Sequence, residues 1–150
     1  MKKAVIMIGI QGSGKSTFCR RFLPDIPRVN LDSLKTRKNE QRMIESCLAQ
    51  GQDYVVDNTN PMRADRARYI PEAKAAGYCV IGYFMQSRLQ ECIERNNRRG
   101  EEERIPAKAI AMTSNRLELP SYSEGFDELY FVSIQGEETL INKWREENEL

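Results

Sequence analysis

Short apolar runs alternate with amphipathic stretches along most of this chain. The run Ala4–Ile8 is continuously apolar, which is typical of a strand buried on both faces of a sheet. Residues 15–22, which follow soon after, have the polar–apolar spacing of a helix. The pattern predicts four further strands, at Arg28–Leu31, Tyr54–Val56, Tyr78–Phe84 and Leu129–Ile134.

Amphipathic segments between these strands predict helices. Apolar residues recur at helical spacing within residues 38–50, and Gly51 is placed to end that helix. Asn60 followed by Pro61 predicts the cap and first turn of a helix that runs to Gly77, with a kink near Pro71. The other predicted helices cover residues 89–97, residues 106–117 and a polar closing segment at about 137–148.

Strand–helix alternation repeated five times predicts an α/β domain with a central parallel five-stranded sheet and helices on both faces. The chain contains no repeat, low-complexity tract or linker, so we expect residues 1–150 to form a single domain. Ligands of such sheets bind at the carboxyl ends of the strands. The residues directly after each strand are therefore the first candidates for a functional site.

The composition narrows the chemistry that such a site can use. The 150 residues include no histidine, which excludes Ser-His-Asp triads, Cys-His pairs and histidine metal sites. Any general base near neutral pH must then be a carboxylate, Lys, Cys or Tyr. The four cysteines lie far apart and form no CxxC pair, so we interpret them as free thiols.

The net charge of +1 is unevenly distributed along the chain. Residues 1–100 carry 18 basic and 10 acidic side chains, and residues 101–150 carry 5 basic and 12 acidic ones. This asymmetry permits a basic cleft for a polyanion, although scattered solvated charge is the simpler interpretation. No apolar stretch approaches the ~20 residues of a membrane span, so we expect a cytoplasmic protein that makes no membrane contact.

Residues 9–16 read GIQGSGKS and match the phosphate-binding pattern G-x-x-x-x-G-K-[ST]. Glycines let backbone N–H groups turn around a polyphosphate, and the N-terminus of the following helix adds its positive dipole end. Lys15 is placed to reach the β- and γ-phosphates of ATP, and Ser16 to bind Mg²⁺. The other predicted phosphate-binding residues are Gly9, Gly12, Ser13, Gly14 and Thr17.

This loop predicts a nucleotide-binding protein without specifying what is done with the nucleotide. Motor ATPases, GTPases and kinases all use it. A chain of 150 residues leaves little room for a GTPase switch apparatus, and it contains no N-K-x-D guanine-reading tetrapeptide. These features favour a small phosphotransferase.

Two carboxylates and a group of arginines complete the candidate site. Asp32 and Asp57 each follow a predicted strand, where one could accept a hydroxyl proton and the other order the metal. Either Asp alone could equally be a helix cap or turn residue. Arg95, Arg98 and Arg99 end a predicted helix, where an arginine could close on the transferring phosphate or simply complement the helix dipole.

With these residues in place, the chain resembles the polynucleotide 5′-hydroxyl kinase family, which includes the kinase halves of phage and animal end-healing enzymes. The resemblance spans about residues 4–134, and five blocks agree in order and spacing. They read GIQGSGKSTF, VNLDSLK, DNTNPMRADRARYI, ERNNRRGEEERIP and PSYSEGF. The resemblance implies a P-loop kinase fold with a short helical lid at about residues 95–117.

The resemblance also implies a role for each matched residue. Lys15 and Ser16 fall on the family's phosphate and metal residues, and Asp32 on the general base that takes the proton of the 5′-hydroxyl. Asp57 falls on a carboxylate near the metal, and Arg99 on the lid arginine that contacts the donor phosphates. The resemblance further implies that Arg95 contacts the donor. The implied contacts to the acceptor are Asp32, Lys35, Asp57, Thr59 and Ile105.

Three functions follow from these observations. The first is Mg²⁺-dependent transfer from ATP to the 5′-hydroxyl of DNA or RNA, alongside a separate phosphatase or ligase partner. The second is phosphorylation of a small hydroxylated metabolite, nucleoside or antibiotic, which the acidic run Glu101–Glu103 in the lid favours. The third is a nucleotide-dependent regulatory module without transfer activity. The oligomeric state is left open.

Overall fold

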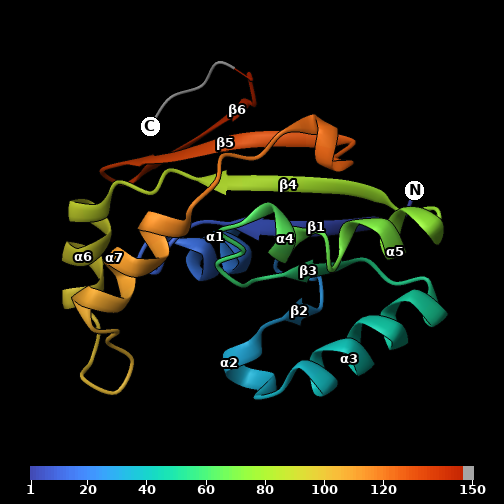
Figure 1. The fold of residues 1–150 in the computed structure, drawn as a ribbon, viewed down its shortest axis with the longest axis horizontal. Coiled ribbons are helices and arrows are strands. Elements are labelled where there is room, and N and C mark those ends of the chain that lie inside the picture. Colours follow the sequence, from blue (N-terminus) through green and yellow to red (C-terminus); the bar gives the residue numbers. More distant parts are fainter. Residues whose placement is uncertain (147–150) are drawn as a thin grey trace.

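A single six-stranded sheet forms the centre of the molecule (Figure 1). The structure, a computed structural model, describes residues 1–146. The strand order is β2-β3-β1-β4-β5-β6, in which all neighbours are parallel except the antiparallel pair β5–β6. The strands are β1 (Lys3–Ile8), β2 (Arg28–Val29), β3 (Tyr54–Val56), β4 (Cys79–Met85), β5 (Glu128–Gln135) and β6 (Glu138–Lys143).

Helices cover both faces of the sheet, as the sequence predicted. Alternate residues of β1 enter two different cores, because successive side chains of a strand point to opposite faces. Val5 and Met7 pack with Phe18 of α1 (Lys15–Phe22). Ile6 packs in the opposite core, whose members include Ile44 of α3 (Arg37–Gln50). The central strand is thus buried on both faces, which explains its continuous apolar run.

The helices agree with most of the predicted segments. α3 ends at Gly51, which adopts a left-handed φ of 66°, as predicted for a glycine that ends a helix. The sequence did not predict the short helix α2 (Leu31–Leu34), which takes the place of the end of the second predicted strand. The two remaining long helices are α6 (Leu89–Asn97) and α7 (Ala107–Arg116), and a 3₁₀ turn covers Tyr122–Glu124.

The predicted helix from Asn60 to Gly77 was wrong in its start, and the kink expected near Pro71 is a complete break. The segment forms two short helices, α4 (Arg63–Arg66) and α5 (Ile70–Ala75), and Pro71 lies in the first turn of the second. Met62 caps α4, whereas Asn60 has a φ of 46° and donates from Nδ2 to the Met7 carbonyl at 2.9 Å. Its side chain therefore ties the loop to β1 and caps no helix.

The polar closing helix predicted at about 137–148 was also wrong. Residues 138–143 form β6, which pairs with β5 and makes the sheet six-stranded instead of five-stranded. Gly136, with a φ of 66°, lies in the tight turn between them. A short strand exposed at the sheet edge needs few apolar residues, so its polarity resembled that of a solvated helix. Residues 147 and 148 of the predicted helix lie outside the described residues.

The carboxyl ends of the parallel strands place the candidate residues together. The P-loop follows β1, α2 follows β2, and the segment that carries Asp57 follows β3. Figure 1 shows α6 and α7 at the end toward which β4 points. No helix formed by residues 1–146 has both the length and the apolar character that a bilayer crossing requires.

Candidate active site

The P-loop wraps tightly because glycines allow close backbone contacts. Gly12 has a φ of 82°, and a Cβ there would lie 2.2 Å from the carbonyl oxygen of Cys92 on α6. Gly14, with a φ of 97°, leads directly into α1. The Gly9 amide donates to the Thr59 carbonyl at 3.0 Å. The loop is therefore held between α6 on one side and the segment after β3 on the other.

Lys15 lies inside this loop and is partly shielded from solvent. Its Nζ donates to the Ile10 carbonyl at 2.9 Å and approaches Ser13 Oγ at 3.5 Å. Burial lowers the pKa of Lys15 from 10.5 to about 8, the negative charge of Asp57 opposes this shift, and the positive charge of Arg99 adds to it. The ammonium is thus poorly solvated and ready to bind an anion.

Ser16 and Asp57 meet at the start of α1. Ser16 Oγ donates to Asp57 Oδ2 at 3.1 Å, and Arg28 Nε donates to the same oxygen at 2.6 Å. Asp57 is only 1% exposed, and among the described residues its Oδ1 has no hydrogen-bond partner. The residues after β1 and β3 therefore form one cluster.

The donor set at this cluster fits Mg²⁺. Hydroxyl and carboxylate oxygens are the protein ligands that this ion prefers, and it takes its remaining ligands from waters and substrate phosphates. The unpartnered, buried Oδ1 of Asp57 beside the Ser16 hydroxyl offers such oxygens. Within residues 1–146 no group of three or more acidic or cysteine side chains could hold a metal by itself.

Asp32 lies on α2, exposed at the same edge of the sheet. Two hydrogen bonds join this helix to the segment after β3. Asn30, the cap of α2, donates from Nδ2 to the Asp57 carbonyl at 2.6 Å. The Leu31 amide donates to Asn58 Oδ1 at 3.0 Å. The carboxylate of Asp32 is thus carried on a short helix that is fixed to the backbone of Asp57.

A buried polar network lies behind α2. Glu40, which is 4% exposed, accepts from Arg37 Nη1 at 2.9 Å and from the Tyr69 hydroxyl at 3.0 Å. Its other oxygen accepts from Asn58 Nδ2 at 2.9 Å. Since Asn58 Oδ1 accepts a hydrogen bond from the Leu31 amide, the network orients the helix that carries Asp32.

Lys35 ends α2 in an unusual backbone conformation. It has a φ of 76° and a ψ of −37°, a region that side-chain-bearing residues rarely adopt. Its amide donates to the Leu31 carbonyl at 2.7 Å, and its side chain is exposed. Such strain persists where the surrounding structure enforces it, and it often marks a functional site.

The predicted lid residues lie on and after α6. Arg95 donates from Nη1 to the Gly12 carbonyl at 3.2 Å, which joins α6 to the P-loop. Arg99 is half-buried and lies close enough to Lys15 to lower its pKa. The Asn96 side chain makes two hydrogen bonds to the backbone of Ile105. Its Oδ1 accepts from the Ile105 amide at 2.9 Å, and its Nδ2 donates to the Ile105 carbonyl. Ile105 itself packs against the small core of Ile10, Cys92 and Ile110.

Two other predicted residues have weaker structural links to the site. Thr17 is exposed, and its hydroxyl accepts from Arg20 at 3.4 Å. Thr59 contacts the P-loop through its carbonyl, which accepts from Gly9. All four cysteines are free thiols, as predicted, and only Cys79 is partly exposed.

Sequence reasoning missed a buried ion pair that braces the site. Arg66 is fully buried and makes two hydrogen bonds to Glu124, at 2.8 and 3.1 Å. Its Nη1 donates to the carbonyls of Asn60, Pro61 and Glu118. The pair joins two blocks of the family resemblance, DNTNPMRADRARYI and PSYSEGF, which are far apart in sequence. Charge and spacing alone could not have revealed that these blocks meet.

A sequence model described as "AAA domain" matches residues 5–120. The chain belongs to this family. It is 29% identical, over 96% of its length, to a mimivirus protein (Acanthamoeba polyphaga mimivirus) named for bifunctional polynucleotide phosphatase/kinase activity. It is 27% identical, over 97% of its length, to the bifunctional polynucleotide phosphatase/kinase of Schizosaccharomyces pombe. The chain spans 37% and 38% of those two relatives.

The solved structure of a kinase shares this fold. A gluconokinase from Sinorhizobium meliloti superposes with a TM-score of 0.58 at 20% sequence identity, covering 87% of this chain and 82% of that one. At that identity the similarity establishes the fold. The AAA-family chain therefore has the α/β P-loop kinase fold, as the resemblance implied.

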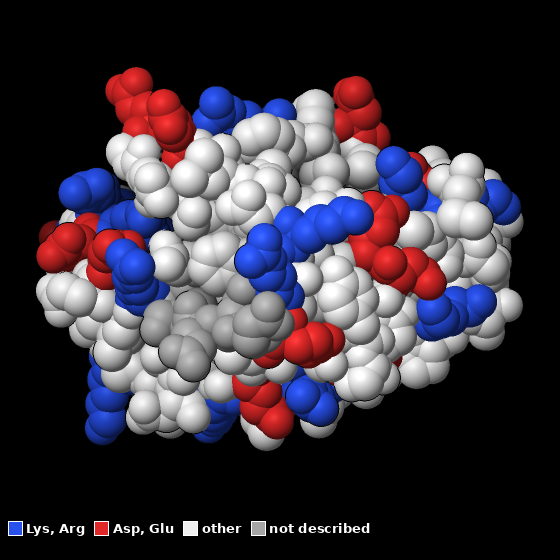
Figure 2. Space-filling view, turned by 90° about the horizontal axis from the view of Figure 1, so that it is seen from above, with Lys and Arg blue, Asp and Glu red and all other residues white. Residues whose placement is uncertain are grey.

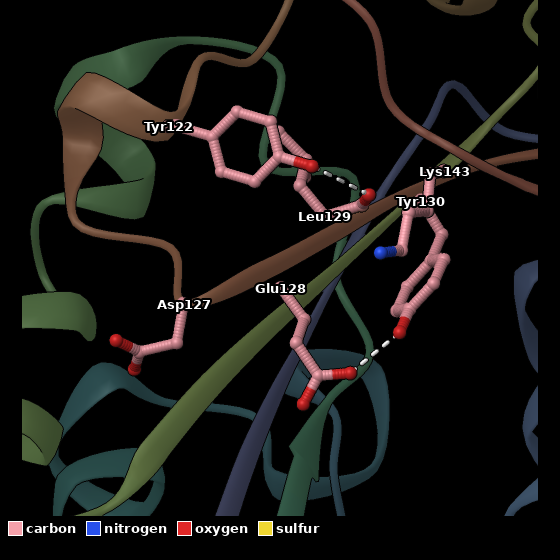
Figure 3. Close-up of a pocket in the computed structure, with 6 residues that line it drawn as sticks. All are labelled: Tyr122, Asp127, Glu128, Leu129, Tyr130 and Lys143. Carbon is pink, nitrogen blue, oxygen red and sulfur yellow. Dashed lines mark hydrogen bonds between the residues drawn. The ribbon is translucent and has the colours of Figure 1, made fainter.

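A surface pocket of about 240 Å³ lies away from these residues. Figure 3 shows that it is lined by the start of β5, where Tyr130 donates to Glu128. This is the amino end of β5, whereas the P-loop follows the carboxyl end of the parallel strand β1. Viewed from above, the molecule presents interspersed basic and acidic side chains (Figure 2). The candidate active site and this pocket therefore lie at opposite ends of the parallel strands.

Proposed function

We propose that this chain transfers the γ-phosphate of ATP to the 5′-hydroxyl end of a polynucleotide. The observation that carries the proposal is the meeting of Lys15, Ser16 and Asp57 beside α2, in a chain that aligns along almost its whole length with relatives named for polynucleotide phosphatase/kinase activity. A separate phosphatase or ligase would then act on the same ends.

Each residue has a defined task in the proposed reaction. The Asp32 carboxylate accepts the proton of the acceptor hydroxyl while the hydroxyl oxygen forms a bond to the γ-phosphorus. The bond from that phosphorus to the β–γ bridging oxygen breaks, and ADP leaves. Lys15 and Arg99 stabilise the negative charge that develops on the phosphoryl and bridging oxygens. Ser16 and Asp57 would hold Mg²⁺, which neutralises phosphate charge when it is bound.

The proposed lid covers about residues 95–117. Support comes from the contacts at its base, because Arg95 binds the P-loop backbone while Asn96 clamps Ile105. The segment between Asn96 and Ile105 includes the exposed run Glu101–Glu103, and Arg104 ties it together through hydrogen bonds to the carbonyls of Asn97 and Arg99. We expect this segment to close over the donor so that Arg99 meets the phosphates, and Lys35, Thr59 and Ile105 to line the acceptor side.

The acidic run Glu101–Glu103 favours a second candidate, phosphorylation of a small hydroxylated molecule such as a nucleoside. The two candidates are separated by γ-labelled ATP and a panel of 5′-hydroxyl DNA, 5′-hydroxyl RNA, 3′-phosphorylated mononucleotides and nucleosides. We expect label on the oligonucleotides. Label on nucleosides alone supports the second candidate, and ATP binding with no transfer to any acceptor supports a regulatory module.

Salt should separate polynucleotide from small-molecule acceptors. Neutralising about three acceptor phosphates with Lys or Arg weakens single-strand binding about tenfold or more between roughly 50 and 200 mM salt. We therefore expect kcat/KM for an oligonucleotide to fall by that factor. A 3′-phosphorylated mononucleotide measured in parallel corrects for effects on ATP binding. Equal salt dependence of the two acceptors would contradict the polynucleotide proposal.

The lowered pKa of Lys15 predicts a pH dependence of nucleotide binding. The protonated ammonium binds phosphate, and the free protein loses that proton as the pH rises through about 8. The affinity for ADP without divalent cation should therefore fall above pH 8, approaching tenfold per pH unit. Calorimetric titration from pH 7 to 9.5 measures it. Lys15→Arg, which stays charged, should show no such fall; an equal fall in both proteins would refute the assignment.

A further inference from the structure

Arg28 occupies an unexpected place in the candidate site. It lies in β2 at the edge of the sheet, and its guanidinium contacts both residues of the proposed metal site. Nε donates to Asp57 Oδ2 at 2.6 Å, and Nη2 donates to Ser16 Oγ at 2.9 Å. The Ser16 hydroxyl in turn donates to Asp57 at 3.1 Å. A positive charge thus lies against the Ser16 hydroxyl and the Asp57 carboxylate, the two groups that would hold a divalent cation.

Asp57 needs such a charge when no metal is bound. Its side chain is 1% exposed, and a buried carboxylate without a partner is strongly unfavourable. Lys15 donates its hydrogen bonds to Ile10 and Ser13 and makes none to Asp57. Arg28 therefore supplies the closest counter-charge to Asp57.

The Arg28 side chain can also move away from Asp57 and Ser16. Its side chain is 36% exposed, in contrast to the fully buried Arg66, and its hydrogen bonds go only to Asp57 and Ser16 among the described residues. β2 is two residues long and lies at the sheet edge, so the side chain has solvent on one side. A long, flexible and half-solvated side chain can swing out without disturbing the core.

We propose that Arg28 is a resident counter-ion that holds Asp57 and Ser16 in the nucleotide-free protein and is displaced when Mg²⁺ and nucleotide bind. The guanidinium lies against the Ser16 oxygen and the Asp57 carboxylate, where a divalent cation would bind, and two positive charges this close repel each other, so binding of one disfavours the other. With Arg28 in place, a higher Mg²⁺ concentration is needed to fill the site than would be needed without it. This inference rests on the proposed nucleotide site and is independent of the acceptor.

The expected size of the effect follows from occupancy. If the Arg28 side chain is in place about 90% of the time, only about a tenth of the molecules are ready for the metal, and the apparent affinity for Mg²⁺ is about tenfold weaker. Removing the guanidinium should remove that factor. Loss of Arg28 therefore improves Mg²⁺ binding, whereas loss of an ordinary ligand or phosphate contact would weaken it.

The test is thermal unfolding of wild-type protein, Arg28→Gln and Arg28→Lys at a constant saturating ADP concentration and increasing Mg²⁺. A ligand that binds the folded state raises Tm, so the Mg²⁺ concentration at half of the rise reports the apparent affinity. We expect this midpoint to fall about threefold to tenfold in Arg28→Gln and to stay nearer wild type in Arg28→Lys. Arg42→Gln, an exposed change of equal charge on α3, should keep the wild-type midpoint.

The same melts without Mg²⁺ and ADP give a second measurement. Arg28→Gln should then melt below Arg42→Gln, because Asp57 has lost its counter-charge. An unchanged or higher Mg²⁺ midpoint in Arg28→Gln overturns the inference. Absence of ADP stabilisation in wild-type protein at any Mg²⁺ concentration contradicts both this inference and the proposed function. The predicted midpoints together with no transfer to an oligonucleotide would contradict the proposed function alone.

Discussion

Replacing Asp32 with asparagine is expected to lower turnover by about 10²–10⁴-fold while nucleotide binding stays intact. The carboxylate is the proposed acceptor of the hydroxyl proton, and an amide of the same shape cannot take it. Asp32 is exposed on α2 and has no role in the core, so the substitution should fold normally. Single-turnover transfer from ATP to a 5′-hydroxyl oligonucleotide, with calorimetric ADP binding, measures both properties.

The matched control is Asp25→Asn, an exposed carboxylate in the connection between α1 and β2. It makes the same chemical change outside the proposed site and should keep turnover near that of the wild type. Near-normal turnover in Asp32→Asn would rule out Asp32 as the base. A parallel loss of ADP binding would instead indicate that the residue acts on the donor site.

The second large effect is expected from the buried pair of Arg66 and Glu124. Glu124→Gln should lower the free energy of unfolding by about 3–5 kcal/mol, because it leaves a buried guanidinium without its counter-charge. Arg66 also holds the carbonyls of Asn60 and Pro61, in the loop that follows Asp57. Urea unfolding monitored by circular dichroism measures the loss.

An exposed pair provides the control for that loss. Lys74 and Asp127 are 3.0 Å apart, with side chains 43% and 42% exposed. Lys74→Gln should cost less than about 1 kcal/mol, because solvent screens exposed pairs. If Glu124→Gln costs no more than Lys74→Gln, the buried pair is not what fixes the loop after Asp57.

Local patterns predicted the regular parts of this fold and failed where long-range contacts decide. The range predicted for β3 and the end of α3 at Gly51 agree with the structure, because burial on both faces and a left-handed glycine leave clear local signals. β6 was missed because an exposed edge strand has no apolar run. Asn60 was misread as a cap because its partner, Met7, lies 53 residues away.

The same distinction holds for the candidate site. Lys15, Ser16 and Asp57 could be predicted because the P-loop motif and the strand ends locate them. Arg28 could not, because its sequence position indicates only a strand and its hydrogen bonds depend on the packing of β2 beside β3. The network of Glu40 likewise joins α3 to Asn58 and Tyr69, 18 and 29 residues away. Side chains of this kind become visible only once the elements are packed.

Transfer of label from γ-labelled ATP, with Mg²⁺, to a single oligonucleotide tests the proposed kinase activity. The substrate carries a 5′-hydroxyl, and the control is the same oligonucleotide with a 5′-phosphate. We expect label at the 5′ end of the first oligonucleotide and none on the second. Absence of label on the 5′-hydroxyl oligonucleotide, under conditions in which the protein binds ATP, would contradict the proposed activity.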